Sequence, residues 1–313
     1  MKRKDYLFQL LNYWNTVLVN VKPDIIFFNT WPHTADYPLY ILAKYVFKID
    51  CIFINPIPFF NKNLYTLGTN TEDLSATFKE EYLNGDHLKI SKIIDEYIKE
   101  LKFGNPSIPK HVSNYYKFLD NNYNSFFTIS NFFEIFKQIL SLNIFKTSSY
   151  FFKKNRINIS NNKSRMTNLN YIFFKINLFY KNTKLKNYYL SLCKKIKFEE
   201  NYIYFPAPYQ PEVLSNLYAG HYEDILKVID MINETMPKNW KIYFKEHNNT
   251  FKKFDKGALY RKNEFYNELN KYKNLKLVDF NLSTFDLIDN AKVTITIGGT
   301  AGWESVIRGI PSI

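Results

Sequence analysis

Cysteine is scarce in this sequence, which has only Cys51 and Cys193. Two cysteines cannot build the disulfide framework of a small secreted protein, and their scarcity is typical of a reducing compartment. The sequence also lacks a Cys-x-x-Cys pair and any cluster of cysteine with histidine. Because such clusters supply most structural zinc sites, we expect no metal, and no motif calls for a cofactor.

Long apolar runs are also missing. No stretch approaches the roughly 18 uninterrupted apolar residues that a membrane-spanning helix needs. The N-terminus, MKRKDYLFQLLNYW, is basic but has no long apolar core and no small-residue cleavage site of a signal peptide. We therefore predict a cytoplasmic protein, either soluble or peripheral on a membrane.

Acidic residues are absent from one long segment, residues 135–195. The net charge of the chain is +13, and this segment, with 13 basic residues and no acidic one, carries all of the excess. It is also rich in Phe and Tyr. A basic, aromatic surface suits an anionic membrane or a polyanionic glycan, whereas nucleic acid is not expected because no nucleic-acid-binding motif accompanies the charge. The alternative is a solvated helical insertion in a lysine-rich sequence.

The N-terminal part has the pattern of a βαβ unit. A helix is predicted over residues 6–19, a buried strand over 25–28, a helix over 37–47 and a second buried strand over 51–54. The polar loop at residues 29–36 follows the first strand. Open α/β sheets bind their ligands at such carboxyl ends of strands.

The rest of the chain first loses and then regains strand signals. Residues 70–195 are mostly helical in pattern, with a helix at 86–103 and a polar loop at 160–163. After residue 200, strands and helices alternate, as in a Rossmann-like domain. We predict an N-terminal domain over residues 1–195 and a C-terminal domain over 196–313. The strands of the latter are predicted at 202–205, 240–245, 275–278 and 292–297, and its helices at 222–235, 263–272 and 284–289.

The last residues, VTITIGGTAGWESVIRGIPSI, predict a strand, a glycine turn, a helix from Ala301 to Arg308 and the start of another strand. Such a turn can hold a phosphate, since glycine lets the backbone come close and the first helical N–H groups point at the anion. The plainer alternative is a turn whose glycines only shape the corner.

Polar residues follow four predicted strands, and parallel sheets would bring these ends together in a cleft between two domains. In the C-terminal domain, backbone N–H groups of the glycine turn and the side chains of Lys245 and His247 are candidates for phosphate binding, and Glu304 for the ribose hydroxyls. Each of these residues also has a structural alternative. Lys245 and the neighbouring Glu246 would be exposed to solvent, His247 would have a purely structural role in its loop, and Glu304 would complement the helix dipole. These residue types suit the binding of a sugar nucleotide, which donates its sugar in a transfer reaction. The candidate residues for binding this donor are Gln210, Glu212, Lys245, His247, Gly299, Thr300, Ala301 and Glu304.

In the N-terminal domain, His33 and Asp36 lie in one loop and are candidate catalytic residues. Either side chain can act as a general base for an acceptor hydroxyl that attacks an anomeric carbon. The alternative for Asp36 is to cap the helix that begins at Tyr37.

The ordered motifs resemble the bacterial capsule polysaccharide biosynthesis family. The resemblance rests on KPDIIFFNTWPHTADYPLYILAKY, FPAPYQPE, KIYFKEH and TITIGGTAGWESVIRGIPSI, and covers about residues 20–60 and 200–313. It departs at Asn248, where the family usually has proline, and the middle segment is not matched.

The resemblance implies a GT-B-like α/β fold of two Rossmann-like domains, with a C-terminal domain that continues beyond Ile313. The helical, basic segment at residues 135–195 is predicted from the sequence pattern alone, as an insertion in this fold. It implies a glycosyltransferase that moves a sugar from a nucleotide donor, such as CMP-3-deoxy-manno-octulosonate, to a lipid-linked or polysaccharide acceptor. The implied partners are the nucleotide sugar, the acceptor, an anionic inner-membrane surface and other capsule assembly proteins. The alternatives are a nucleotide-sugar epimerase and a non-catalytic fragment that binds glycan or membrane.

Overall fold

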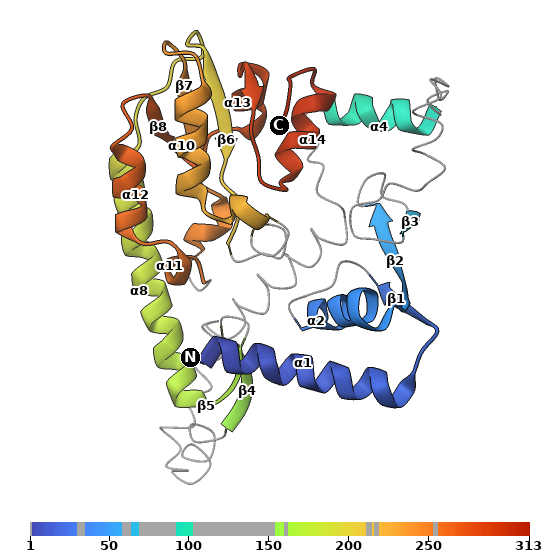
Figure 1. The fold of residues 1–313 in the computed structure, drawn as a ribbon. Helices are drawn as coiled ribbons and strands as arrows, with labels where there is room; N and C mark the ends of the chain where they lie inside the picture. Colours follow the sequence, from blue (N-terminus) through green and yellow to red (C-terminus); the bar gives the residue numbers. More distant parts are fainter. Residues whose placement is uncertain are drawn as a thin grey trace. The chain divides into compact units, whose positions relative to one another are not determined.

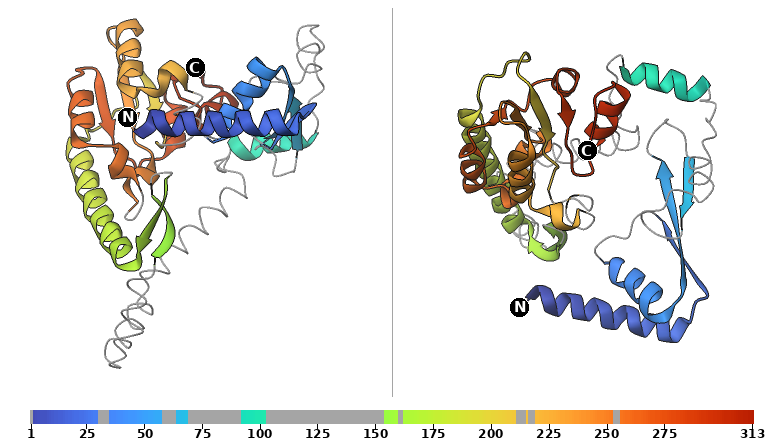
Figure 2. Two further views of the ribbon diagram at one scale, coloured as in Figure 1. Left: turned by 60° about the horizontal axis from the view of Figure 1, so that its bottom comes forward. Right: turned by 45° about the horizontal axis from the view of Figure 1, so that its top comes forward.

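The computed structural model describes residues 2–29, 35–57, 64–68, 92–102, 154–159, 162–210, 215, 219–252 and 256–313 (Figure 1). The chain divides into two compact units, Met1–Lys110 and His111–Ile313. This division differs from the boundary near residue 195 that the sequence predicts. Its physical reason is that helix α8 (Asn168–Leu192) packs alongside α12 (Asn263–Asn270) of the second unit (Figures 1 and 2).

The first unit contains the predicted βαβ arrangement, which is confirmed. After α1 (Lys2–Val21), strand β1 (Ile25–Asn29) pairs in parallel with β2 (Asp50–Ile57). The connection is α2 (Tyr37–Ile41), continued by the π-helical turn η1 (Leu42–Phe47). Helix α4 (Lys92–Lys102) lies further along the chain.

Strand β2 is longer than predicted and has a second neighbour. It continues through Pro56, and its end pairs antiparallel with β3 (Leu64–Gly68), a strand that the sequence did not predict. Pairing with β1 stops at Ile54. Beyond that point one edge of β2 makes no ladder with β1, and proline, which has no N–H to donate, is tolerated at such an edge.

The expectation that residues 135–195 are mostly helical and lack strands is wrong for one part. Strands β4 (Lys154–Ile159) and β5 (Asn162–Thr167) form an antiparallel pair, so the predicted polar loop at 160–163 overlaps the start of β5. Both strands are mostly polar in sequence, KNRINI and NKSRMT, and Arg156 pairs with Arg165. Short strands with few apolar residues give only a weak hydrophobic pattern, so the sequence did not predict them. The helical expectation is confirmed for α8.

The second unit is built on a parallel sheet with the Rossmann strand order. Strands β6 (Tyr202–Pro206), β7 (Lys241–Lys245), β8 (Leu275–Val278) and β9 (Val293–Thr294) lie in the order β8-β7-β6-β9, with β6 in the middle. Ser312 forms a parallel bridge with Thr294 on the far side of β9. The predicted α/β class is therefore confirmed.

Side chains alternate between the two faces of this sheet. Ile203 and Phe205 join a core that includes residues of α8, α10 (Ile225–Thr235) and α12. Tyr202 and Tyr204 pack in a second core with α13 (Thr284–Asp289). The shorter elements η2 (Gly220–Glu223), η3 (Asn248–Phe251), α11 (Gly257–Tyr260) and α14 (Thr300–Ile307) complete the unit. Among the described residues, no helix is long and apolar enough to cross a bilayer.

Candidate functional site

The strand order marks one place on the second unit where a ligand is expected. From β6 the chain moves to β7 on one side, and it later returns to β9 on the other side of β6. Where connections diverge in this way, their loops leave a crevice outside the carboxyl ends of the two strands. The loop after β6 and the turn that leads from β9 into α14 flank this position.

The glycine turn after β9 has the geometry that the sequence predicts. Gly298 has a φ of 65°, a conformation that favours glycine, and α14 begins at Thr300 after an extended Gly299. Gly298, Gly299 and Thr300 are exposed. A Cβ at Gly302 would lie 2.8 Å from Cγ2 of Thr296, so glycine allows α14 to approach its strand. The turn therefore presents the start of a helix to solvent, while anion binding by Thr300 and Ala301 stays a prediction.

Lys245 is not a solvated residue, so that alternative is wrong. Its side chain is 6% exposed, and Nζ donates to the carbonyl of Leu282 at 2.5 Å and to Oγ1 of Thr284 at 2.9 Å. Burial lowers the pKa of Lys245 to about 8, and the charges of Asp279 and Glu304 oppose this shift. Lys245 thus ties β7 to the start of α13, and its role in binding an anion remains a prediction.

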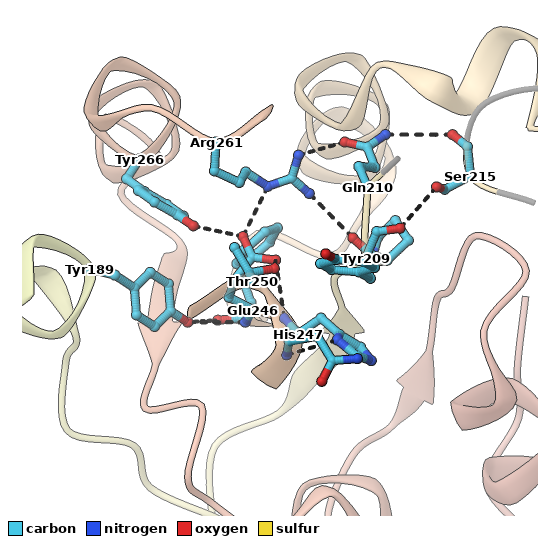
Figure 3. Close-up of polar contacts among 12 residues, drawn as sticks. Tyr189, Tyr209, Gln210, Ser215, Glu246, His247, Thr250, Arg261 and Tyr266 are labelled. Carbon is cyan, nitrogen blue, oxygen red and sulfur yellow. Dashed lines mark hydrogen bonds and ion pairs between the residues drawn. The ribbon is translucent and has the colours of Figure 1, made fainter. Parts of the chain in front are cut away.

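Glu246 is fully buried, which also contradicts a solvated strand end. Its carboxylate accepts four hydrogen bonds (Figure 3). The donors are Nε of Arg261 at 3.0 Å, the hydroxyl of Tyr266 at 2.8 Å, Oγ1 of Thr250 at 3.2 Å and the backbone N–H of His247 at 3.1 Å. A buried carboxylate with a paired cation and this many donors is held in one orientation.

Arg261, which the sequence reasoning missed, links this carboxylate to the loop after β6. It is 5% exposed, and besides Glu246 it donates to the carbonyl of Pro208 at 3.3 Å and to Oε1 of Gln210. The amide of Gln210 donates in turn to the carbonyl of Glu223 at 3.1 Å. Arg261 lies between two short helices and belongs to no motif, so no sequence signal marked it.

His247 and Glu304 have different exposures. His247 is exposed; its Nδ1 accepts from the N–H of Asn249 at 3.2 Å, and its ring lies 5.6 Å from that of Tyr209. It therefore caps η3 beside the loop after β6. Glu304 is 7% exposed, and the first turn of α14 contains no acidic residue, so the alternative of a first-turn carboxylate that complements the helix dipole is wrong. The predicted ligand contacts of both residues stay predictions.

The predicted catalytic residues lie in the first unit. Asp36 stands at the N-cap of α2, but its side chain makes no capping hydrogen bond there. Side-chain capping is therefore not its role in this structure, and general-base function stays a prediction. His33, like the donor-site candidate Glu212, lies outside the described residues.

One pocket of the second unit, of about 480 Å³, lies beside the loop after β6. Within the described ranges, no group of three or more His, Cys, Asp or Glu residues is arranged to hold a metal ion. The pocket is lined by Gln210, Gly220, His221, Glu223, Asp224, Lys227 and Tyr260.

Comparisons with known proteins give only distant similarities. No protein-family model and no curated protein matches the chain. Among solved structures, KpsC, a beta Kdo 2,7 transferase of Thermosulfurimonas dismutans, is similar at 16% identity and a TM-score of 0.27 over 48% of this chain and 45% of that chain. The UDP-GlcNAc 2-epimerase of Methanocaldococcus jannaschii is similar at 13% identity and a TM-score of 0.28, over 98% of this chain and 65% of that one.

A putative UDP-N-acetylglucosamine 2-epimerase from Listeria monocytogenes is similar at 12% identity and a TM-score of 0.27, over 98% of this chain and 61% of that one. The chain thus spans less than two thirds of the length of each of these structures. Similarities at these TM-scores do not assign a family or an activity to the chain.

Proposed function

We propose that this chain is a glycosyltransferase of capsular polysaccharide biosynthesis whose second unit binds the nucleotide of a sugar-nucleotide donor. The observation that carries the proposal is the exposed glycine turn before α14. This turn follows β9, next to β6, where the chain has left β6 for β7 on one side and returned to β9 on the other. The motifs that resemble the capsule family fall on the same loops. CMP-3-deoxy-manno-octulosonate is the first donor to test.

The proposed reaction is attack by an acceptor hydroxyl oxygen on the anomeric carbon of the donor sugar. The new C–O bond forms, the bond from the anomeric carbon to the phosphate oxygen breaks, and the nucleotide leaves with the electron pair. Backbone N–H groups at the start of α14 stabilise the charge on the departing phosphate. Asp36 or His33 takes the proton of the acceptor hydroxyl, and the acceptor is a lipid-linked or polysaccharide glycan.

Replacing Thr300 by proline is expected to weaken nucleotide binding about tenfold, because one N–H donor to a charged phosphate is lost. The helix itself tolerates the change, since proline is favoured at the first helical position and the preceding Gly299, at φ −89° and ψ 152°, is compatible with it. Calorimetric titration with CMP, UDP and their sugar conjugates measures the dissociation constants.

Thr300→Ala is the matched control, because it keeps the N–H and removes only the side chain. It is expected to bind as the wild type does. Equal affinities of the wild type and Thr300→Pro would contradict the phosphate assignment. If the wild type converts a UDP-sugar to its epimer without any acceptor, the protein is an epimerase and the glycosyltransferase proposal is wrong.

An anionic membrane surface is the proposed location of the acceptor, and α8 is the described element that suits it. Phe173, Ile176 and Tyr180 lie on the outward face of α8 at helical spacing and are 62%, 50% and 60% exposed. Lys181 and Lys184 are exposed next to them, in the segment that has no acidic residue. Large apolar side chains flanked by lysine suit an anionic lipid interface.

The double variant Lys181→Glu/Lys184→Glu is expected to bind phosphatidylglycerol vesicles at least about tenfold more weakly than the wild type, because each lysine near the surface contributes about 1 kcal/mol. Vesicle co-sedimentation measures the binding. Lys238→Glu/Lys292→Glu, which reverses two exposed lysines outside the segment, is the control. Equal loss in both double variants would argue against α8 as the contact.

A further inference from the structure

We infer that Arg261 is a positioning residue, which fixes Pro208 and Gln210 after β6 so that this part of the wall of the proposed nucleotide site is preformed. The inference rests on the proposed function for its consequence, but on the hydrogen bonds of Arg261 for its geometry. Three chain segments meet at this side chain: the loop after β6, the residue after β7, and the junction between α11 and α12 (Figure 3).

The guanidinium group is held from several sides. Nε donates to the buried carboxylate of Glu246, which also neutralises the charge of Arg261. The group lies over the ring of Phe265, 4.6 Å from its centroid. The two terminal nitrogens then point at the carbonyl of Pro208 and at Oε1 of Gln210. Because the guanidinium is planar and presents its donors as a fork, fixing one edge fixes the direction of the others.

Gln210 is therefore oriented at both ends of its amide. Oε1 accepts from Arg261, and Nε2 donates to the carbonyl of Glu223, so the side chain cannot rotate without losing both contacts. Oε1 has a second lone pair, which remains for a ligand donor. Gln210 also lines the 480 Å³ pocket. A side chain held in this way loses little conformational entropy when a ligand binds.

Lysine cannot replace arginine in this role. Arg261→Lys keeps a cation for Glu246, but a single ammonium has no planar fork that reaches Glu246, Pro208 and Gln210 together. Tyr266→Phe is the matched control, because it removes one hydrogen bond from the same carboxylate and leaves Gln210 in place. Arg261→Lys is expected to raise the dissociation constant for the bound nucleotide about tenfold, and Tyr266→Phe to change it less than about twofold.

A second measurement reads the position of Gln210 without any ligand. The sequence contains three glutamines, Gln9, Gln138 and Gln210, so selective ¹⁵N labelling of glutamine side chains gives few amide signals to assign. The signal pair of Gln210, identified by its loss in Gln210→Met, is expected to move toward that of a solvated amide in Arg261→Lys. It is expected to stay in place in Tyr266→Phe.

The two readouts separate the inference from the function on which it builds. An unmoved Gln210 signal in Arg261→Lys overturns the inference, as does a dissociation constant that changes equally in Arg261→Lys and Tyr266→Phe. A wild-type protein that binds none of the nucleotides contradicts the proposed function, while the amide signal still decides whether Arg261 fixes Gln210. If Arg261→Lys does not fold, Gln210→Met replaces it for binding: a tenfold loss supports the inference and an unchanged affinity overturns it.

Discussion

Replacing Glu246 by alanine is expected to lower the free energy of unfolding by about 3–5 kcal/mol. The carboxylate is fully buried, and its loss leaves Arg261, 5% exposed, without its counter-charge. The hydroxyls of Tyr266 and Thr250 lose their acceptor at the same time. An uncompensated buried charge is among the few causes of such a large change.

Urea unfolding of the full-length chain, followed by tryptophan fluorescence, measures this effect. Glu268→Ala is the control, because Glu268 pairs with Lys271 on the surface of α12, where the two side chains are 49% and 69% exposed. Exposed pairs of this kind contribute at most about 1 kcal/mol. A similar loss of unfolding free energy in the two variants would mean that the buried Glu246–Arg261 pair contributes no more to stability than the exposed pair.

Replacing Lys245 by methionine is expected to change how stability depends on pH. Burial lowers the pKa of Lys245 to about 8, below its value in the unfolded chain. The unfolded state therefore binds more protons than the folded state above pH 8, and the wild type gains stability from this group as pH rises. Between about pH 7.5 and pH 10 the gain is about 2 kcal/mol, and Lys245→Met lacks it.

The measured quantity is the difference in unfolding free energy between the wild type and Lys245→Met at these two pH values. Other groups act on both proteins alike. Burial raises the pKa of Cys193 to about 12, for example, which lowers stability as pH rises above the thiol's ordinary value. Because both proteins contain Cys193, this effect cancels in the difference between them. A difference that is the same at both pH values would show that folding does not lower the pKa of Lys245.

Much of the second unit could be predicted from the sequence. Buried parallel strands are short apolar runs such as Tyr202–Pro206, and the helices between them keep one apolar face, so both leave a periodic signal. The glycine turn was also predictable, because Gly298 and Gly302 each meet a local requirement that only glycine satisfies without strain. These features depend on neighbours in the sequence.

The parts that could not be predicted depend on contacts between distant residues. The structural alternative for Lys245 and Glu246 was a solvated strand end, because a charged residue after a strand is usually exposed. Their burial follows from Arg261 and Thr284, which lie elsewhere in the chain and are brought near only by the fold. The β4–β5 pair is mostly polar in sequence and gives only a weak hydrophobic pattern. Sequence periodicity reports on neighbouring residues only, so it cannot predict a side-chain contact between residues that are far apart in the sequence.

The position of β6 in the middle of its sheet has a consequence for folding during synthesis. Its pairing with β7 becomes available early, whereas its other edge must wait for β9, because Ile203 pairs with Val293 near the end of the chain. Until then β6 offers an open edge of backbone groups to any neighbouring chain. The two loops that flank the divergence around β6 come together only with this late, two-residue pairing. The arrangement of these two loops is therefore completed later than the pairing of β6, β7 and β8, which can already have formed.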